Sequence, residues 1–353
     1  MVLRGNDSRK SRLLIIGCGS IGQRHAKVLR ELGVEDVLLF DTDEKRAESL
    51  GRELQMEEFH TLEDAFKAEP DAAVICAPTG LHLELAFEAL RHNCHLFIEK
   101  PISHSTDGVA DLLHEVAEKE RLLLAGYNFR FDPLLNTAKQ WLNEKRIGTV
   151  TGARLHFGSY LPWRHPLEDY RAGYGACKSL GGGVILDAIH EIDIALWFFG
   201  WPDSIYSAGG KYSDLEIDVE DTAEITITYA DKVVSVHLDF VQRPAERWFE
   251  VTGTGGRIAG NLFARSLRWF DGVSQKWFST DIGTTIEDTY RSEMRHFLDC
   301  LEGKDTPLID GETAVQSLIL AEEAKQSMQW RLPISLSGLD LWEEAIGRTV
   351  SRR

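Results

Sequence analysis

Glu99-Lys100-Pro101 ends a short apolar run and places a lysine at the edge of a predicted strand. Pro101 confines Lys100 to an extended conformation and can itself take a cis peptide bond, so the lysine side chain is aimed in one direction. An ammonium group held in this way can bind a substrate hydroxyl through a charged hydrogen bond. The alternative is an ordinary solvated lysine.

A second polar set follows three glycines, Gly181 to Gly183. If residues 184–199 form one helix, one face carries an apolar stripe made of Ile185, Ile189, Ile192, Leu196 and Phe199. Asp187, His190 and Asp193 then project from the other side. An aspartate one turn from a histidine can orient the ring and support its protonated form, which suits a general base. The alternative is a water-facing helix surface.

The turn Gly17-Cys18-Gly19-Ser20-Ile21-Gly22 follows a predicted strand and opens a predicted helix. In that context the pattern Gly-x-Gly-x-x-Gly indicates a dinucleotide site. The first glycine permits the turn, the second lets the backbone approach the pyrophosphate, and the third lets helix pack on strand. The helix N-terminus would hold the pyrophosphate.

Asp41 stands at the end of the second predicted strand, about 20 residues after Gly22. A carboxylate there accepts hydrogen bonds from the adenosine ribose and repels a 2′-phosphate, which favours NAD over NADP. Asp41 could instead cap the next helix, although Asp43 is the better placed cap.

The amino-acid composition limits the kinds of molecule that the protein is expected to bind. The chain has 353 residues and a net charge of −17, from 56 acidic and 39 basic residues, which opposes binding to nucleic acid or anionic lipid. No apolar run is long enough for a membrane helix, so we expect a cytoplasmic protein with residues 1–11 as a disordered leader. The five scattered cysteines predict neither disulfides nor a metal site, and Cys177 is read as a spacer rather than a reactive thiol.

Strand and helix signals alternate through the first 126 residues, as in parallel βαβ units. The unalternated apolar runs predict buried strands at 13–16, 37–40, 72–76, 95–98 and 122–125. Helices are expected over 23–32, with Gly33 as the C-terminal cap, and over 44–53, 81–91 and 106–119. We therefore predict an α/β chain whose residues 1–126 form a nucleotide-binding domain.

Residues 127–353 show a different pattern of apolar and polar residues. Alternating patterns at 224–229 and 234–240, joined by a hairpin at 229–232, indicate an antiparallel sheet with one buried face. Further strands are expected over 149–157, 247–253, 257–262 and 266–270, and helical content over 339–346. The prediction is a second α+β domain with a large, mostly antiparallel open sheet. Its exposed face predicts a homodimer or homotetramer.

Taken together, the order of motifs resembles the glucose-fructose oxidoreductase, inositol dehydrogenase and rhizopine-catabolism family, or Gfo/Idh/MocA family. The resemblance covers most of the chain. It rests on Gly17 to His25, Ala77-Pro78-Thr79 with His82, Glu99-Lys100-Pro101, Tyr127 to Pro133, the triple-glycine helix, and Tyr290 to Leu301.

The resemblance implies a Rossmann domain followed by an open sheet, with a sugar or polyol in the cleft between them. It implies that Lys100 positions the reacting hydroxyl and His190 transfers its proton. Pro78, Thr79, His82 and Glu99 would line the nicotinamide side, and Arg130 would be structural. The family places its aspartate four residues before the histidine, whereas Asp187 precedes His190 by three. Either Asp187 is shifted by a local bulge or Leu186 takes the aspartate's place.

We therefore expect an NAD-dependent enzyme in which His190 removes the proton of the substrate hydroxyl. A hydride leaves the carbon that bears this hydroxyl for the nicotinamide, and Lys100 holds the forming carbonyl oxygen. The loop from Tyr160 to Arg171 is expected to face the substrate, with Trp163 against a sugar ring and Arg164 or Arg171 binding a carboxylate or phosphate. An anionic or amino-sugar derivative is favoured. These loop residues could instead serve packing. Two other functions remain open, an NADH-dependent ketosugar reductase and a non-catalytic NAD(H)-binding sensor.

Overall fold

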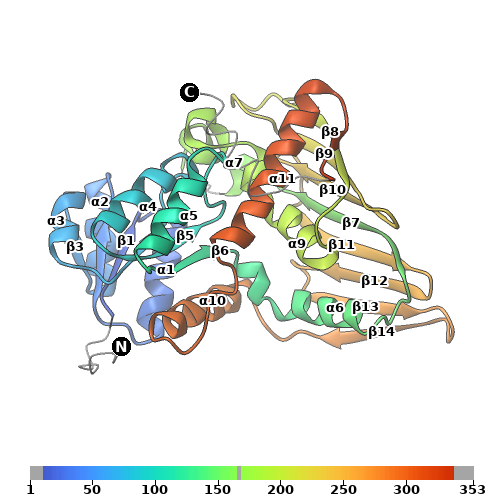
Figure 1. Cartoon of the computed structure of the whole chain (residues 1–353), viewed down its shortest axis with the longest axis horizontal. Coiled ribbons are helices and arrows are strands. Elements are labelled where there is room, and N and C mark those ends of the chain that lie inside the picture. Colours follow the sequence, from blue (N-terminus) through green and yellow to red (C-terminus); the bar gives the residue numbers. More distant parts are fainter. Residues whose placement is uncertain (1–10, 165–167, 338–353) are drawn as a thin grey trace.

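The computed structural model describes residues 11–164 and 168–337 (Figure 1). The predicted leader up to residue 10, His165 of the substrate loop, and the predicted helix near residues 339–346 lie outside the described residues. Two β-sheets lie side by side in the view, with α11 (Gly311–Trp330) running between them.

The first sheet is wholly parallel and has the order β3-β2-β1-β4-β5-β6. Its strands are β1 (Leu13–Ile16), β2 (Val37–Phe40), β3 (Glu57–Phe59), β4 (Ala72–Ile75), β5 (His95–Glu99) and β6 (Leu123–Gly126). The five predicted strands are confirmed. The sequence prediction missed β3 because its residues, Glu57-Glu58-Phe59, carry no apolar run.

Helices cover both faces of this sheet. Side chains from α1 (Ser20–Glu31), α2 (Glu44–Leu54) and α10 (Ile286–Leu301) share one core with the sheet. Those of α3 (Leu62–Lys67), α4 (His82–Arg91) and α5 (Val109–Glu118) share the other. Gly33 has the positive φ of 80° that a C-terminal cap requires, as predicted. The helix α10, although distant in sequence, contacts α1 and brings Met294 and Phe297 into the core of the first sheet.

The second sheet has nine strands in the order β14-β13-β12-β11-β7-β10-β9-β8-β15. They are β7 (Val150–Gly158), β8 (Ser204–Gly210), β9 (Thr222–Thr228), β10 (Val233–Asp239), β11 (Glu246–Gly253), β12 (Gly256–Asn261), β13 (Ser266–Asp271), β14 (Lys276–Asp281) and β15 (Ile334–Ser335). The pair β7 and β10 is parallel, and the other pairs are antiparallel. The predicted fold class is confirmed.

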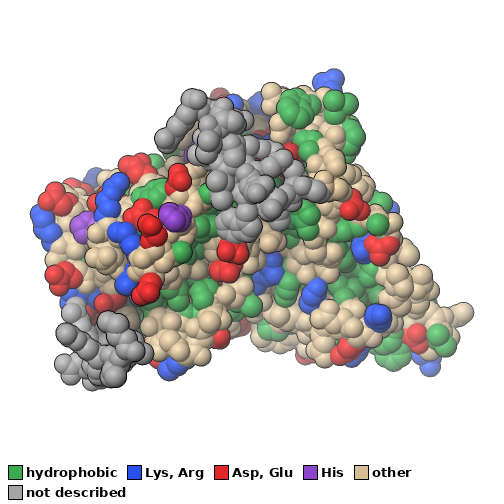
Figure 2. All heavy atoms as spheres, viewed as in Figure 1, with side chains coloured by type: hydrophobic (Ala, Val, Ile, Leu, Met, Phe, Trp, Pro, Cys, Tyr) green, Lys and Arg blue, Asp and Glu red, His purple; other side chains and the backbone are tan. Residues whose placement is uncertain are grey.

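One face of this sheet is covered and the other is open. Ala153, Leu155 and Phe157 of β7 are buried, while Arg154 and His156 lie on the opposite face. The covering helices are α6 (Pro133–Asn143), α8 (Val184–Asp187), α9 (Ile189–Phe199) and α11. Within the described residues, no helix is both long and apolar enough to cross a membrane. On the face drawn in Figure 2, acidic and basic side chains are interspersed.

The helix predicted over residues 184–199 is divided, which corrects the sequence prediction. It stops at Asp187, and α9 starts again at Ile189, because Ala188 leaves the helical region with φ −98° and ψ 32°. The predicted apolar stripe is buried, with Phe199 only partly so. His190 and Asp193, on the supposed polar side, are buried as well, so the water-facing alternative is wrong for this helix.

Candidate active site

The glycine turn is crowded on its protein side and open at its middle glycine. Gly17 has a φ of 98°, and a Cβ there would lie 2.8 Å from the carbonyl of Cys76. A Cβ on Gly22 would collide with the carbonyl oxygen of Gly17, because α1 packs directly on the turn. A Cβ on Gly19 would meet nothing within 4 Å, and Gly19 is the N-cap of α1 with no side-chain cap. An anionic group can therefore approach the free N–H groups of α1 at this point.

Asp41 supports this turn from the end of β2. Its buried carboxylate accepts hydrogen bonds from the backbone N–H of Cys18, at 2.6 Å, and of Asp43, at 2.8 Å. The cap of α2 is Asp43, whose side chain accepts from the N–H of Lys45. Asp41 is thus not the helix cap. Each carboxylate oxygen has a further lone pair for a ribose hydroxyl, and that contact stays a prediction.

Residues predicted to line the nicotinamide side cluster at the carboxyl ends of β4 and β5. Thr79 begins the 3₁₀ turn η1 (Thr79–Leu81) and is buried. The ring nitrogens of His82 lie 2.8 Å from the carbonyl oxygens of Ala77 and Pro101. Burial lowers the pKa of His82 below its ordinary value. His82 therefore ties the two strand ends together and acts as a scaffold. Ser20 and Ile21 belong to the glycine turn and form the first residues of α1.

Glu99 forms a buried cluster with His25 and Glu293. Its Oε1 lies 2.6 Å from Nε2 of His25, and its Oε2 accepts from the N–H of Lys100 at 3.1 Å. Glu293 of α10 approaches His25 and Glu99, and neither of its carboxylate oxygens has a hydrogen-bond partner among the described residues. Burial and the charge of Glu99 raise the pKa of Glu293 well above 4.5. Sequence reasoning missed Glu293 because nothing local links it to Glu99.

Lys100 reaches from the end of β5 to the end of α8. Its Nζ donates a 2.7 Å hydrogen bond to the backbone oxygen of Asp187 and lies 4.0 Å from the Asp187 carboxylate. The Lys100 side chain is only 16% exposed, and the peptide bond to Pro101 is cis. The reading of Lys100 as a solvated surface lysine is therefore wrong.

Asp187 partners Lys100, Arg164 and Tyr174. Its carboxylate binds Nη1 of Arg164 and accepts from the hydroxyl of Tyr174. Burial alone would raise the pKa of Asp187, but Arg164, Lys100 and the Tyr174 hydrogen bond outweigh it and hold that pKa below its usual range. No hydrogen bond joins Asp187 to His190 within the described part of the chain, contrary to the expected pairing, because the break at Ala188 alters their spacing. Sequence reasoning missed Tyr174.

His190 lies in an apolar setting beside this ion cluster. Its ring centroid is 4.5 Å from that of Phe129 and 5.9 Å from that of Tyr127. Its Nδ1 is buried and has no partner among residues 11–164 and 168–337. Burial lowers the pKa of His190 well below 6.5, and the charges of Lys100 and Arg247 lower it further. His190 is therefore a neutral imidazole that can accept a proton.

Two ion pairs hold α9 on either side of His190. Arg130 donates to both carboxylate oxygens of Asp193, at 2.7 and 2.8 Å, which agrees with a structural role for Arg130. Arg247 of β11 lies 2.7 Å from the Glu191 carboxylate, a contact that no local sequence pattern predicts. Because these groups are nearly fully buried, they fix the rotation of α9 and hence the position of His190.

Only part of the predicted substrate loop reaches the ion cluster around Lys100 and Asp187. Arg164 reaches Asp187, and its Nη2 is buried with no hydrogen-bond partner in the described ranges. Trp163 is 63% exposed and packs edge-on against Tyr160. Arg171 pairs with Asp169 and Glu216. Neither arginine is thus an unpaired positive charge.

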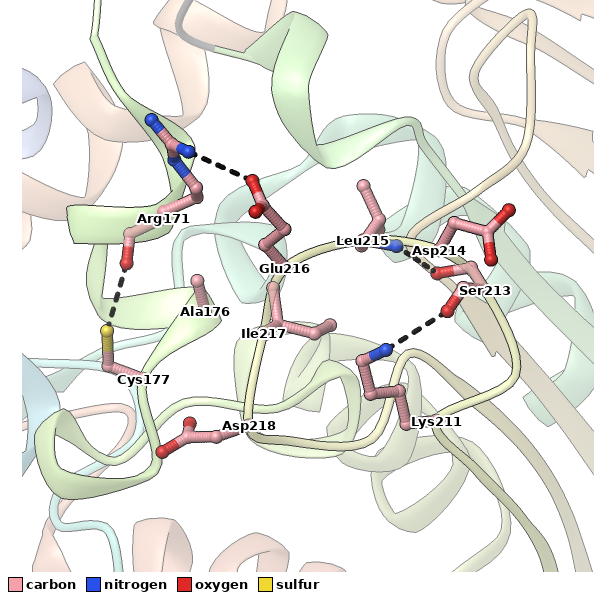
Figure 3. A pocket seen from close by; sticks show the side chains of 10 residues that line it. All are labelled: Arg171, Ala176, Cys177, Lys211, Ser213, Asp214, Leu215, Glu216, Ile217 and Asp218. Atoms are coloured by element: carbon pink, nitrogen blue, oxygen red, sulfur yellow. Dashed lines mark hydrogen bonds and ion pairs between the residues drawn. The ribbon is translucent and has the colours of Figure 1, made fainter.

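An open cavity of about 580 Å³ lies beside Arg171 (Figure 3). It is lined by Arg171, Ala176 and Cys177 on one side and by Lys211 and residues 213–218 on the other, and the thiol of Cys177 donates to the backbone oxygen of Arg171. Lys100, Asp187 and His190 do not line it. We place the candidate active site at those three residues, where ionisable groups of both domains meet, and not in this cavity.

The chain is similar to known oxidoreductases. Residues 11–127 match the oxidoreductase family with an NAD-binding Rossmann fold, and residues 135–259 match the GFO/IDH/MocA C-terminal domain. Myo-inositol 2-dehydrogenase of Thermotoga maritima is 27% identical over 95% of this chain and 100% of its own length. The scyllo-inositol 2-dehydrogenase (NAD(+)) of Bacillus subtilis is 25% identical over 92% of this chain and 96% of its own.

Among solved structures, the WlbA dehydrogenase of Bordetella pertussis, in complex with NADH and UDP-GlcNAcA, has the same fold. Its TM-score is 0.79 at 20% identity, over 93% of this chain and 99% of that one. The two matched regions together span most of the chain and include the glycine turn, Lys100 and His190. The protein belongs to the GFO/IDH/MocA family of NAD-binding oxidoreductases.

Proposed function

We propose that this enzyme oxidises a hydroxyl-bearing carbon of a sugar or polyol with NAD, using Lys100 and His190. The observation that carries the proposal is the meeting of the Lys100 ammonium, from the end of β5, with Asp187 and the neutral His190 of the second domain. The names of the relatives support a polyol substrate, since two of them are inositol dehydrogenases.

The residues present fit the cofactor. The open space at Gly19 and the free N-terminus of α1 suit a pyrophosphate, and Asp41 stands at the neighbouring strand end for the ribose. Ser20, Ile21, Ala77, Pro78, Thr79, His82 and Glu99 complete the set proposed to surround or support the cofactor. Bound NAD supplies the hydride acceptor, which no side chain can be.

In this proposal, Lys100 holds the reacting oxygen and His190 takes its proton. The Lys100 ammonium is fixed by the Asp187 carbonyl and still has two N–H donors, enough to bind a hydroxyl that becomes a carbonyl. His190 is neutral, so it accepts the hydroxyl proton while the hydride leaves the same carbon. Asp187 serves as a positioning residue for Lys100 and Arg164 rather than as a partner of the His190 ring.

The charges near the site favour an uncharged polyol of the inositol type as the first substrate to test. Arg164 is paired with Asp187, and Arg171 with Asp169 and Glu216. The unpartnered Nη2 of Arg164 is the observation that keeps a carboxylated or amino-sugar derivative as the second candidate. Trp163, which is exposed in the same loop, is proposed to contact the sugar ring of either substrate.

The test is an NADH-formation assay with NAD⁺ and a panel of inositols, aldoses, amino sugars and sugar acids. We expect turnover with at least one polyol or sugar. The reverse assay, with NADH and ketosugars, decides the favoured direction. Tight NADH binding without turnover in either direction would replace the proposal with the sensor function.

The open face of the second sheet supports a further part of this proposal, a homodimer or homotetramer formed through that face. Sedimentation velocity of the full chain distinguishes the two assemblies from a monomer, which would refute it.

A further inference from the structure

Two histidines and an aspartate converge on the open face of the second sheet. His156 of β7 and His237 of β10 are direct neighbours in the parallel register, with ring centroids 4.7 Å apart. Asp239 follows on the same strand face, and its Oδ2 lies 3.0 Å from Nε2 of His237. Trp248 stacks on the other side of His156 at 4.9 Å. His190 belongs to α9, which covers the opposite face.

Hydrogen bonds to neighbouring groups orient the side chains of Asp239 and His237, so that one atom of each faces the centre of the cluster. Oδ1 of Asp239 accepts from the N–H groups of Val241 and Gln242, at 2.7 and 2.6 Å, which leaves Oδ2 toward the histidines. The Glu224 carboxylate binds Nδ1 of His237, which leaves Nε2 toward Asp239. In protein metal sites, a ligating histidine is usually held by a carboxylate at its other ring nitrogen, as Glu224 holds Nδ1 of His237 here.

A fourth donor stands beside them. The side-chain oxygen of Gln242 lies 2.7 Å from Nε2 of His156. Gly158 lies next to these oxygen donors, and a Cβ at this position would collide with both the Gln242 oxygen and Oδ2 of Asp239. The missing side chain therefore lets two oxygen donors converge on the two imidazoles. The ligand atoms of His156, His237 and Asp239 all lie within 4.8 Å of one another.

We propose that His156, His237 and Asp239, assisted by Gln242, bind a divalent transition-metal ion such as Zn²⁺ or Ni²⁺. Two imidazoles with one carboxylate suit these ions and not Mg²⁺ or Ca²⁺, which prefer oxygen donors alone. Metal–ligand bonds of about 2.1 Å require donors no more than about 4.2 Å apart, so the stacked rings turn inward slightly on binding.

The test is calorimetric titration of the full chain, freed of any affinity tag and of metal, with ZnCl₂ and separately with NiCl₂ at pH 7.5. We expect one ion per chain, and at least a tenfold weaker affinity in His237→Gln and in His156→Gln. The control is His114→Gln, which alters an exposed histidine paired with Glu118 on α5 and leaves the affinity unchanged. Equal affinity in all four proteins would overturn the proposal.

A second measurement does not depend on how the variants fold. Crystals of the wild-type chain soaked in ZnCl₂ are expected to show an anomalous peak bounded by His156, His237 and Asp239. A peak only at other residues, or none, would overturn the assignment. Neither experiment requires the oxidoreductase to turn over.

Discussion

The Nζ atom of Lys100 and the backbone oxygen of Asp187 are joined by a 2.7 Å hydrogen bond that crosses from the first sheet to the second domain. The Asp187 carbonyl is available because α8 ends at Asp187 and Ala188 interrupts the helical hydrogen bonding. The lysine is thus oriented by the irregular backbone that separates Asp187 from His190.

Lys100→Ala is expected to lower kcat by about 10²–10⁴-fold, because the reacting oxygen loses its charged donor. NAD affinity is expected to stay within a few-fold, since Lys100 bonds to Asp187 and not to the glycine turn. Steady-state kinetics and NADH fluorescence titration measure the two effects. Lys119→Ala, at the residue that follows α5, is the matched control, and a Lys100 variant as active as that control would remove Lys100 from the mechanism.

Protonation of His190 is expected to determine the pH below which kcat/KM falls. Because the pKa of His190 in the folded chain is lowered, the base stays neutral below pH 6.5, and kcat/KM is expected to fall only at still lower pH. His190→Gln is expected to lose about 10²–10⁴-fold in kcat together with that acid limb. An unchanged limb in the variant would assign it to another group.

Asp187→Asn tests the ion cluster. The backbone bond to Lys100 survives, but the Arg164 guanidinium loses its buried counter-charge, so unfolding is expected to become easier by about 3–5 kcal/mol. Tyr174→Phe removes one hydrogen bond to the same carboxylate and is expected to cost about 1 kcal/mol. Urea unfolding measures both. Equal effects of the two substitutions would contradict the charge argument.

Glu293 makes stability depend on pH with a definite sign. Its pKa is raised in the folded chain, so the folded state holds a proton that the unfolded state releases above pH 4.5. Its contribution to stability is therefore complete below pH 4.5 and is lost as the pH rises through the folded-state pKa. Glu293→Gln, which stays neutral, is expected to flatten this decline. Thermal unfolding between pH 4.5 and 8 is the measurement, and parallel curves for the two proteins would refute the assignment.

Asp41→Ser is expected to shift cofactor preference toward NADPH, because the carboxylate that would repel a 2′-phosphate is removed. The hydroxyl of serine is shorter and cannot replace both backbone contacts of Asp41, so NADH affinity is expected to fall as well. Fluorescence titration with NADH and NADPH gives the ratio. An unchanged ratio would leave Asp41 with a purely structural role.

Local patterns predicted most of the fold and the main members of the candidate site. Buried parallel strands appear as apolar runs, and the glycine turn and Lys100 lie at strand ends that the same pattern locates. The pairing of Asp187 with His190 was mispredicted because regular helical spacing was assumed across Ala188. Tyr174 and Glu293 were missed because their partners are set by tertiary packing, which no local spacing encodes.

The return of α10 to the first sheet has a consequence for how the chain folds during synthesis. Met294 and Phe297 complete the core that β1, α1 and α2 begin, so the nucleotide-binding half remains unfinished until α10 has left the ribosome. A fragment that stops at Gly126 would leave that apolar surface in water and is expected to aggregate.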